Sequence, residues 1–330
     1  ITIFVYQNEL CMKTSALFDS LTLLAWGLPA FCLLFLSSCS GNTLTEKPVV
    51  AFEAKATTGE GSIWHPERKS LFWVDIEGKT LYEYLPGLET CNTWTFDRMV
   101  STVVPETDST VVVSLQNEIV RVNLLTGANE HVASIDDVAG TVRCNDGKCD
   151  PEGRLWVGTM GFGAPKGAGK LYTVTRDGVV TVKLDSVTIS NGIVWTADKR
   201  FMYYNDTPTG KVARYKYDAS TGNIEFDGIA VTLAEGTGSP DGMTIDRNGN
   251  LWVAQWGGYG VYCYNPQTGE LLKKIELPAP NVASCAFGGE NLDILYITTA
   301  RAGLSESDLA KYPQSGSLFV CNPGAVGVKA

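Results

Sequence analysis

A tight turn and an apolar tract stand together in Asp150-Pro151-Glu152-Gly153-Arg154-Leu155-Trp156-Val157, and the arrangement returns in Asp246-Arg247-Asn248-Gly249-Asn250-Leu251-Trp252-Val253. The pattern Asp-x-x-Gly is a turn sequence, because Asp hydrogen-bonds the nearby backbone and Gly tolerates positive φ. The Leu-Trp-Val tract has the aromatic and β-branched residues that strands favour. Each copy therefore predicts a strand, a tight turn and a second strand.

Tracts of this kind recur along the whole chain. Their centres lie near Trp73, Val112, Trp156, Tyr203, Trp252 and Tyr296. A period of roughly 40 to 50 residues built from short strands is typical of propeller blades. Several units add a third strand after a Gly turn, and only residues 305–311 before Pro313 have helical capping character. The sequence therefore predicts an all-β fold, a six-bladed β-propeller.

Composition agrees with one large domain. The chain has 330 residues, 44% of them hydrophobic, with 34 Gly and a net charge of -10. The negative charge argues against nucleic acid as a partner, since that affinity depends on clustered Lys and Arg. We expect the propeller at residues 48–330, after a linker at 40–47. Residues 48–53 should pair beside 316–320, because an open ring would leave exposed strand edges.

The first residues are predicted to lie outside this fold. Met12-Lys13 precedes an apolar run, residues 21–36, which ends at Leu36-Ser37-Ser38-Cys39. This pattern is typical of a bacterial lipoprotein signal, so residues 1–39 would be upstream residues plus a signal peptide, with Cys39 lipidated. The alternative is an uncleaved anchor, for which the run is short. We expect a cell-envelope lipoprotein, periplasm-facing or in the outer membrane, that contacts membrane only through its lipid.

Cysteine and histidine limit the chemistry. The six cysteines after Cys39 are Cys91, Cys144, Cys149, Cys263, Cys285 and Cys321. A disulfide between Cys144 and Cys149 would suit an oxidising compartment, but small strand hydrophobes are the favoured interpretation. The two histidines, His65 and His131, are expected at the surface. Together they are too few for a His-rich metal cage, and neither stands in a Ser-His-Asp pattern.

Four polar segments lie at nearly the same distance before the strand tract of their own repeat. Asn145, Asn191 and Asp241 each precede the next strand tract by 11 residues, and Glu60 precedes its tract by 12. Inner propeller strands run the same way, so these segments, predicted as loops before the inner strands, should gather at one mouth of the channel. Carboxylates converging there need a cation to neutralise them. Oxygen ligands suit Ca²⁺, Mg²⁺ or Mn²⁺, with Zn²⁺ as a further candidate. The alternative is that Asn-Gly and Asp-Gly are ordinary turn pairs.

The motifs resemble those of the senescence marker protein/gluconolactonase family, which includes regucalcin and the luciferin-regenerating enzyme. They are Gly59-Glu60-Gly61-Ser62-Ile63-Trp64, Arg143-Cys144-Asn145-Asp146-Gly147, Gly158-Thr159-Met160, Ser190-Asn191-Gly192 and Pro240-Asp241-Gly242-Met243, with Cys285-Ala286-Phe287-Gly288-Gly289 and Thr298-Thr299-Ala300-Arg301 near the end. The resemblance covers roughly residues 50–330 and implies a six-bladed propeller.

The resemblance also implies site roles. Glu60, Asn191 and Asp241 match the family's metal ligands, with Ca²⁺ the first candidate, and Arg143 and Asn145 match its substrate contacts. The implied activity is metal-dependent hydrolysis of lactones, commonly sugar lactones. We add the hypothesis that Asp241 is also the general base. Two alternatives stay open: a propeller that binds a ligand without catalysis, and an esterase or phosphotriesterase at the same site.

One loop departs from the family pattern. Animal members carry an acidic residue after Gly-Thr-Met, whereas residues 161–170 here hold glycines, Phe162 and two lysines, one of them Lys166. The substrate's identity therefore does not follow from the resemblance. Phe162, Lys166, Trp256 and Tyr259 are candidate residues of the rim around the mouth.

Overall fold

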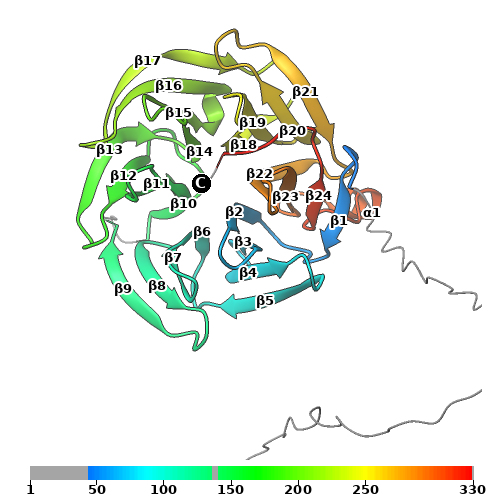
Figure 1. Ribbon diagram of the computed structural model, residues 1–330, viewed down its shortest axis with the longest axis horizontal. Coiled ribbons are helices and arrows are strands. Elements are labelled where there is room, and N and C mark those ends of the chain that lie inside the picture. Colours follow the sequence, from blue (N-terminus) through cyan, green and yellow to red (C-terminus); the bar gives the residue numbers. More distant parts are fainter. Residues whose placement is uncertain (1–43, 136–139, 329–330) are drawn as a thin grey trace, which may run out of the picture. The chain divides into compact units, whose positions relative to one another are not determined.

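The computed structural model describes residues 44–135 and 140–328, and these form short antiparallel sheets arranged around a central axis (Figure 1). The predicted all-β propeller class is confirmed. Cys39 and the predicted signal peptide lie outside the described residues. Within the described ranges no helix is long and apolar enough to cross a membrane.

Each of the first four sheets is a meander of four antiparallel strands. Their bounds are β2 Gly59–His65, β3 Ser70–Asp75, β4 Thr80–Leu85 and β5 Thr90–Thr95; β6 Val100–Pro105, β7 Thr110–Leu115, β8 Glu118–Asn123 and β9 Asn129–Ser134; β10 Val142–Cys149, β11 Leu155–Gly161, β12 Gly169–Val174 and β13 Val180–Val187; β14 Ser190–Trp195, β15 Phe201–Asp206, β16 Lys211–Asp218 and β17 Asn223–Thr232.

The remaining strands form one eight-stranded sheet. Its strands are β18 Ser239–Ile245, β19 Leu251–Trp256, β20 Gly260–Tyr264, β21 Leu271–Glu276, β22 Asn281–Gly288, β23 Ile294–Ala300, β24 Leu318–Cys321 and β1 Val49–Phe52. Strands β19 and β22 are joined in it by a single residue pair, Trp256 with Asn281. A 3₁₀ turn, η1, spans Thr207–Thr209, and the short helix α1 spans Glu306–Lys311 with Ser305 as its N-cap.

Pairing of the two chain ends closes the ring. Strand β1 is antiparallel to β24, with Val49 opposite Val320. This confirms the predicted closure between residues 48–53 and 316–320. The inner strands β2, β6, β10, β14, β18 and β22 contact one another in that order, and β22 also contacts β2. Side chains that point inward from these strands therefore face a common channel.

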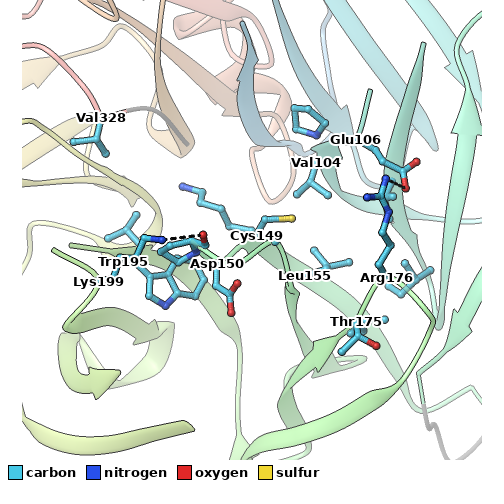
Figure 2. Close-up of a pocket in the computed structure, with 18 of the residues that line it drawn as sticks. Val104, Glu106, Cys149, Asp150, Leu155, Thr175, Arg176, Trp195, Lys199 and Val328 are labelled. Carbon is cyan, nitrogen blue, oxygen red and sulfur yellow. Dashed lines mark hydrogen bonds and ion pairs between the residues drawn. The ribbon is translucent and has the colours of Figure 1, made fainter. Parts of the chain in front are cut away.

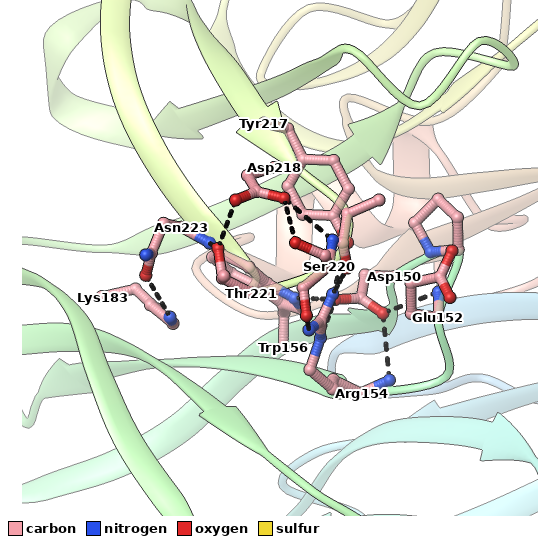
Figure 3. A network of polar contacts seen from close by, with 12 residues as sticks. Asp150, Glu152, Arg154, Trp156, Lys183, Tyr217, Asp218, Ser220, Thr221 and Asn223 are labelled. Atoms are coloured by element: carbon pink, nitrogen blue, oxygen red, sulfur yellow. Dashed lines mark hydrogen bonds and ion pairs between the residues drawn. The ribbon is translucent and has the colours of Figure 1, made fainter.

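The repeated turn of the sequence is a repeated polar network in the structure. Asp150 Oδ2 accepts hydrogen bonds from Trp156 Nε1 at 2.9 Å and Arg154 Nε at 2.7 Å, and Arg154 Nη2 reaches Tyr217 OH of the next sheet at 2.9 Å (Figure 3). Asp246 Oδ2 accepts in the same way from Trp252 Nε1 at 3.1 Å. The Asp thus fixes the turn and satisfies the indole N–H of a buried Trp, which would otherwise lack a partner.

One prediction about the inner strands was wrong. The polar segments expected as loops before the strands are parts of the strands β2, β10, β14 and β18 themselves. Each of these strands shifts register within the segment: between Glu60 and Ile63, Cys144 and Gly147, Ser190 and Ile193, and Pro240 and Met243. Such a β-bulge contains turn-favouring residues and still continues the sheet, which is why the sequence resembled a loop.

The expectations for cysteine and histidine had mixed outcomes. None of the six described cysteines is in a disulfide, so Cys144 and Cys149 are not bonded to each other. His131 is exposed, and its Nδ1 lies 2.6 Å from Glu118 Oε1. His65, expected at the surface, is buried at the end of β2, where its Nε2 lies 2.9 Å from the Thr107 carbonyl oxygen. The neighbouring sheet's β6–β7 turn covers this ring.

Candidate functional site

Two carboxyl groups meet at one end of the channel. Glu60 is the second residue of β2 and Asp241 the third of β18, and both side chains are buried. The two groups share a hydrogen bond, which requires a proton on one of them. Burial, followed by the charge of Asp146, raises the pKa of Glu60 to about 8. Burial and the charge of Glu60 raise the pKa of Asp241 well above its ordinary value.

Asn191 is tied to Asp241 through a hydroxyl group. Asn191 Nδ2 donates to Thr207 Oγ1 at 2.9 Å, and that hydroxyl donates to the carbonyl of Pro240 at 2.9 Å. Because Pro240 directly precedes Asp241, the bonds place the Asn191 amide next to the carboxyl pair. The orientation of Nδ2 toward Thr207 leaves Oδ1 as the atom available to a cation.

Arg143 and Asn145 continue this set of hydrogen-bonded polar groups, which we call the polar ring. Asn145 Nδ2 donates to the carbonyl of Ser190, the residue before Asn191, at 2.8 Å. Arg143 Nη1 donates to Asn145 Oδ1 at 2.6 Å and to the Cys144 carbonyl at 2.9 Å. Burial lowers the pKa of Arg143, while the charges of Glu77, Glu60 and Asp241 favour its cationic form. The five residues predicted for the site are therefore brought together.

Glycine at position 192 is required by this assembly. A Cβ there would lie 2.5 Å from both Asn205 Nδ2 and the Asp241 carbonyl oxygen. The same Asn205 Nδ2 donates to the Asp241 carbonyl at 2.8 Å. Gly192 thus allows β14 to approach β18 closely, so the Asn191-Gly192 pair is not an ordinary turn pair.

Two site residues were missed by the sequence reasoning. Asp146 and Lys148 follow Asn145 on β10 and line a small cavity in the channel with Gly61, Met243 and Ser284. Burial raises the pKa of Asp146 and lowers the pKa of Lys148, whose Nζ donates to the Met243 carbonyl at 3.0 Å. Asp146 belongs to the Arg143–Gly147 motif and Lys148 directly follows it. The signal available in the sequence was therefore two charged residues, in and beside a motif, to which no role was assigned.

The site fits a hard divalent cation. Asn191 Oδ1 and Asp241 Oδ1 are buried, and neither has a hydrogen-bond partner among the described residues. Buried oxygens without partners are costly, and two carboxyl groups in contact repel when ionised, so a cation would relieve both penalties. Across the described ranges no group of three or more His, Cys, Asp or Glu side chains could hold a metal. The fit therefore depends on an amide oxygen, that of Asn191, as the third ligand.

The rim candidates lie near this mouth. Val142 and Arg143 pair with Gly161 and Met160, so the loop containing Phe162 and Lys166 starts beside Arg143. Phe162 is 43% exposed. On the other side Ser239 pairs with Trp256, and Tyr259 packs edge-on against Tyr312 at 5.5 Å between ring centroids.

Residues 58–301 match the sequence model of the family described as the SMP-30/Gluconolactonase/LRE-like region. The chain belongs to this family. YvrE of Bacillus subtilis (strain 168), named as a candidate sugar lactone lactonase, is 35% identical over 271 residues, which is 82% of this chain and 93% of that protein.

Two solved structures support this membership. A luciferin-regenerating enzyme structure matches with a TM-score of 0.79 and 36% identity, covering 86% of this chain and 98% of that one. A calcium-binding protein, regucalcin, from Agrobacterium tumefaciens matches with a TM-score of 0.80 and 28% identity, covering 85% of this chain and 94% of that one. The family resemblance inferred from the motifs is confirmed.

Proposed function

We propose that this family member is a metal-dependent hydrolase that opens lactone rings, with sugar lactones as the substrate class. The observation that carries the proposal is the contact between the buried carboxyl groups of Glu60 and Asp241, beside the unpartnered oxygen of Asn191. A related protein, YvrE, is named as a candidate sugar lactone lactonase. The polar ring around Asn145 and Arg143 supplies donors for a substrate rich in oxygen atoms.

Glu60, Asn191 and Asp241 are the residues that would hold the cation. Ca²⁺ is our first candidate, because carboxylate and amide oxygens are its preferred ligands and a matched structure is of a calcium-binding protein. When bound, the cation would polarise the lactone carbonyl and lower the pKa of water. Three protein ligands leave room for both. Zn²⁺, Mg²⁺ and Mn²⁺ are the alternatives.

Asp241 and Arg143 would act on the proton and the developing charge. The Asp241 carboxylate oxygen that does not bind the cation would accept the proton of the attacking water. Arg143 is held by Asn145 Oδ1 and the Cys144 carbonyl, so its guanidinium needs little reorganisation to orient a substrate oxygen. Asn145 itself is fixed by the Ser190 carbonyl.

We also infer that the ring has six blades and that the chain is a lipoprotein. The eight-stranded sheet joins β18–β21 to β22–β24 and β1 through one residue pair, which supports counting two blades in it. The lipobox at Cys39 supports lipidation and placement in the cell envelope, periplasm-facing or in the outer membrane. Metabolic labelling with a radioactive fatty acid tests this: Cys39→Ala should abolish incorporation, and unchanged labelling would contradict it.

The experiment for the activity combines a substrate panel with chelation. Aldonolactones, homoserine lactones and aryl esters are assayed with Ca²⁺ and with a chelator. Lactone turnover that disappears on chelation is expected. Inactivity of the metal-loaded protein on every substrate would favour a binding protein, and faster turnover of aryl esters than of lactones would favour the esterase alternative.

Variants then assign the role of Asp241. Asp241→Asn keeps the shape of the side chain and removes the proton acceptor, so we expect a loss of at least about 10²-fold in kcat, the usual range for a general base. Asp108→Asn, an exposed carboxylate remote from the site, is the matched control and should leave kcat unchanged. Near-full activity of Asp241→Asn with metal bound would refute the role.

A further inference from the structure

A second and larger cavity lies at the opposite end of the channel. Its volume is about 740 Å³, and it is lined by the C-terminal ends of inner strands, including Pro105, Cys149, Trp195 and Ile245. The proposed metal ligands lie near the start of their strands. From Asp241 to Ile245 the strand advances roughly 13 Å at about 3.3 Å per residue, so the cavity is separate from the carboxyl pair.

Apolar side chains form most of the cavity wall. Val104, Ile119, Leu155, Val174 and Trp195 all line it. Figure 2 shows Leu155 and Cys149 between two polar groups, with Glu106 and Arg176 on one side and Asp150 and Lys199 on the other. A volume between roughly 300 and 1,000 Å³ with apolar walls and a few polar groups is typical of small-molecule sites.

The charges around the cavity favour an anion. The acidic side chains in the lining are already neutralised: Glu106 by Arg121, at 2.5 and 2.7 Å, and Asp150 by Arg154 at 2.7 Å. Arg176 forms a looser pair with the same Glu106, at 3.7 Å, and its side chain is 78% exposed. The lining thus contains four cationic side chains and two carboxylates, on a chain whose net charge is -10.

Two of these cations, Arg176 and Lys199, have loosely held partners. Lys148 differs, because it is buried and interacts with both the Met243 carbonyl and the charge of Asp146. Lys199 pairs with Glu152 at 2.8 Å in a bridge where both side chains are about half exposed. Exposed pairs of this kind contribute little and exchange partners readily. An incoming carboxylate would therefore find cations on both sides of an apolar wall.

We propose that this cavity is a binding site for a small organic anion with an apolar body, such as a medium-chain carboxylate. The apolar body would lie against Leu155, Val174 and Trp195, and the anionic group would pair with Arg176 or Lys199 at the rim. This site is distinct from the lactone site in position and in ligand chemistry.

Calorimetric titration with octanoate tests the proposal, and n-octylamine is the matched cationic probe. We expect one octanoate site per chain and binding of n-octylamine at least about tenfold weaker, since only the sign of the charge differs. Absence of octanoate binding at millimolar concentration, or equal affinity for the two probes, would overturn the proposal.

Variants place the binding in the cavity. Ala197 lines the cavity from an exposed position, so Ala197→Trp should obstruct it and weaken octanoate binding without unfolding the domain. The double variant Arg176→Glu/Lys199→Glu should weaken binding about tenfold or more. The control pair Lys69→Glu/Lys216→Glu reverses two exposed, ion-paired lysines elsewhere and should change affinity less than about twofold. Wild-type affinity in the Ala197→Trp variant would refute the assignment, whatever the lactonase assay shows.

Discussion

Removal of the cation should make the stability of this protein strongly dependent on pH, and Glu60→Gln should remove much of that dependence. In the metal-free fold burial raises the pKa of Glu60 from 4.5 to about 8. Between these values the folded protein keeps the carboxyl proton that the unfolded chain has lost. The contribution of this retained proton to the free energy of unfolding is therefore complete below pH 4.5, and it is lost as the pH rises toward 8.

The magnitude follows from the size of the pKa change. Each pKa unit corresponds to about 1.4 kcal/mol, so a change from 4.5 to about 8 corresponds to at most about 5 kcal/mol. Glu60 and Asp241 titrate as a pair that shares one hydrogen bond, so roughly 3 to 5 kcal/mol is the expected loss for the site. At about 2 to 4 °C per kcal/mol, the melting temperature should fall by roughly 10 °C.

Thermal unfolding with chelator from pH 5 to pH 8.5 measures this loss. Glu60→Gln replaces the ionisable group by a neutral amide, so the slope of melting temperature against pH should fall by about half or more. Ca²⁺ should restore the wild-type melting temperature at pH 8.5 and have a much smaller effect on the variant. Glu67→Gln, an exposed carboxylate in the turn after β2, is the control. Equal slopes for wild type and Glu60→Gln would refute the reasoning.

Three further predictions concern the turn, the substrate contact and the ring closure. Asp246→Ala leaves the buried Trp252 indole N–H without its acceptor and should cost about 1 to 3 kcal/mol in denaturant unfolding, and an unchanged midpoint would contradict this. Arg143→Gln should lower kcat/KM for a lactone by about 10²-fold while calorimetric Ca²⁺ affinity stays within about threefold; a parallel loss of Ca²⁺ affinity would make Arg143 part of the metal site. Truncation before Phe52 removes most of β1 and should destabilise the domain by roughly 2 to 5 kcal/mol, since β24 then pairs only with β23, and unchanged melting would disprove that closure.

Much of the fold followed from periodicity in the sequence. The tract centres at Trp156 and Trp252 lie in β11 and β19, each the strand that follows an inner strand, and residues 48–53 do pair with the last strand. These features depend on local patterns, namely strand-forming tracts and Asp-x-x-Gly turns, which recur once per repeat. The grouping of Glu60, Asn191 and Asp241 followed from the same phase, because equivalent positions of a radial repeat face the same channel.

Features made by contacts between repeats could not be predicted in this way. Asp146 and Lys148 gain their roles from the channel, and their pKa shifts come from burial by other sheets. The large cavity is lined by side chains from several sheets and by Val328 near the end of the described chain. His65 is buried because the Thr107 turn of the next sheet lies over it. The sequence of a single repeat does not show which residues of other repeats will pack against it.

The bulges connect the predictable and the unpredictable parts of the site. An ordinary strand alternates its side chains between two faces, whereas a bulge places two residues opposite one and can redirect a side chain. Each bulge here carries a motif residue, Asn145, Asn191 or Asp241, or directly follows one, Glu60. Gly192 then permits the next inner strand to approach within contact distance. The motif therefore encodes a distorted strand, and the distortion accounts for both the misread loops and the convergence of the oxygen ligands.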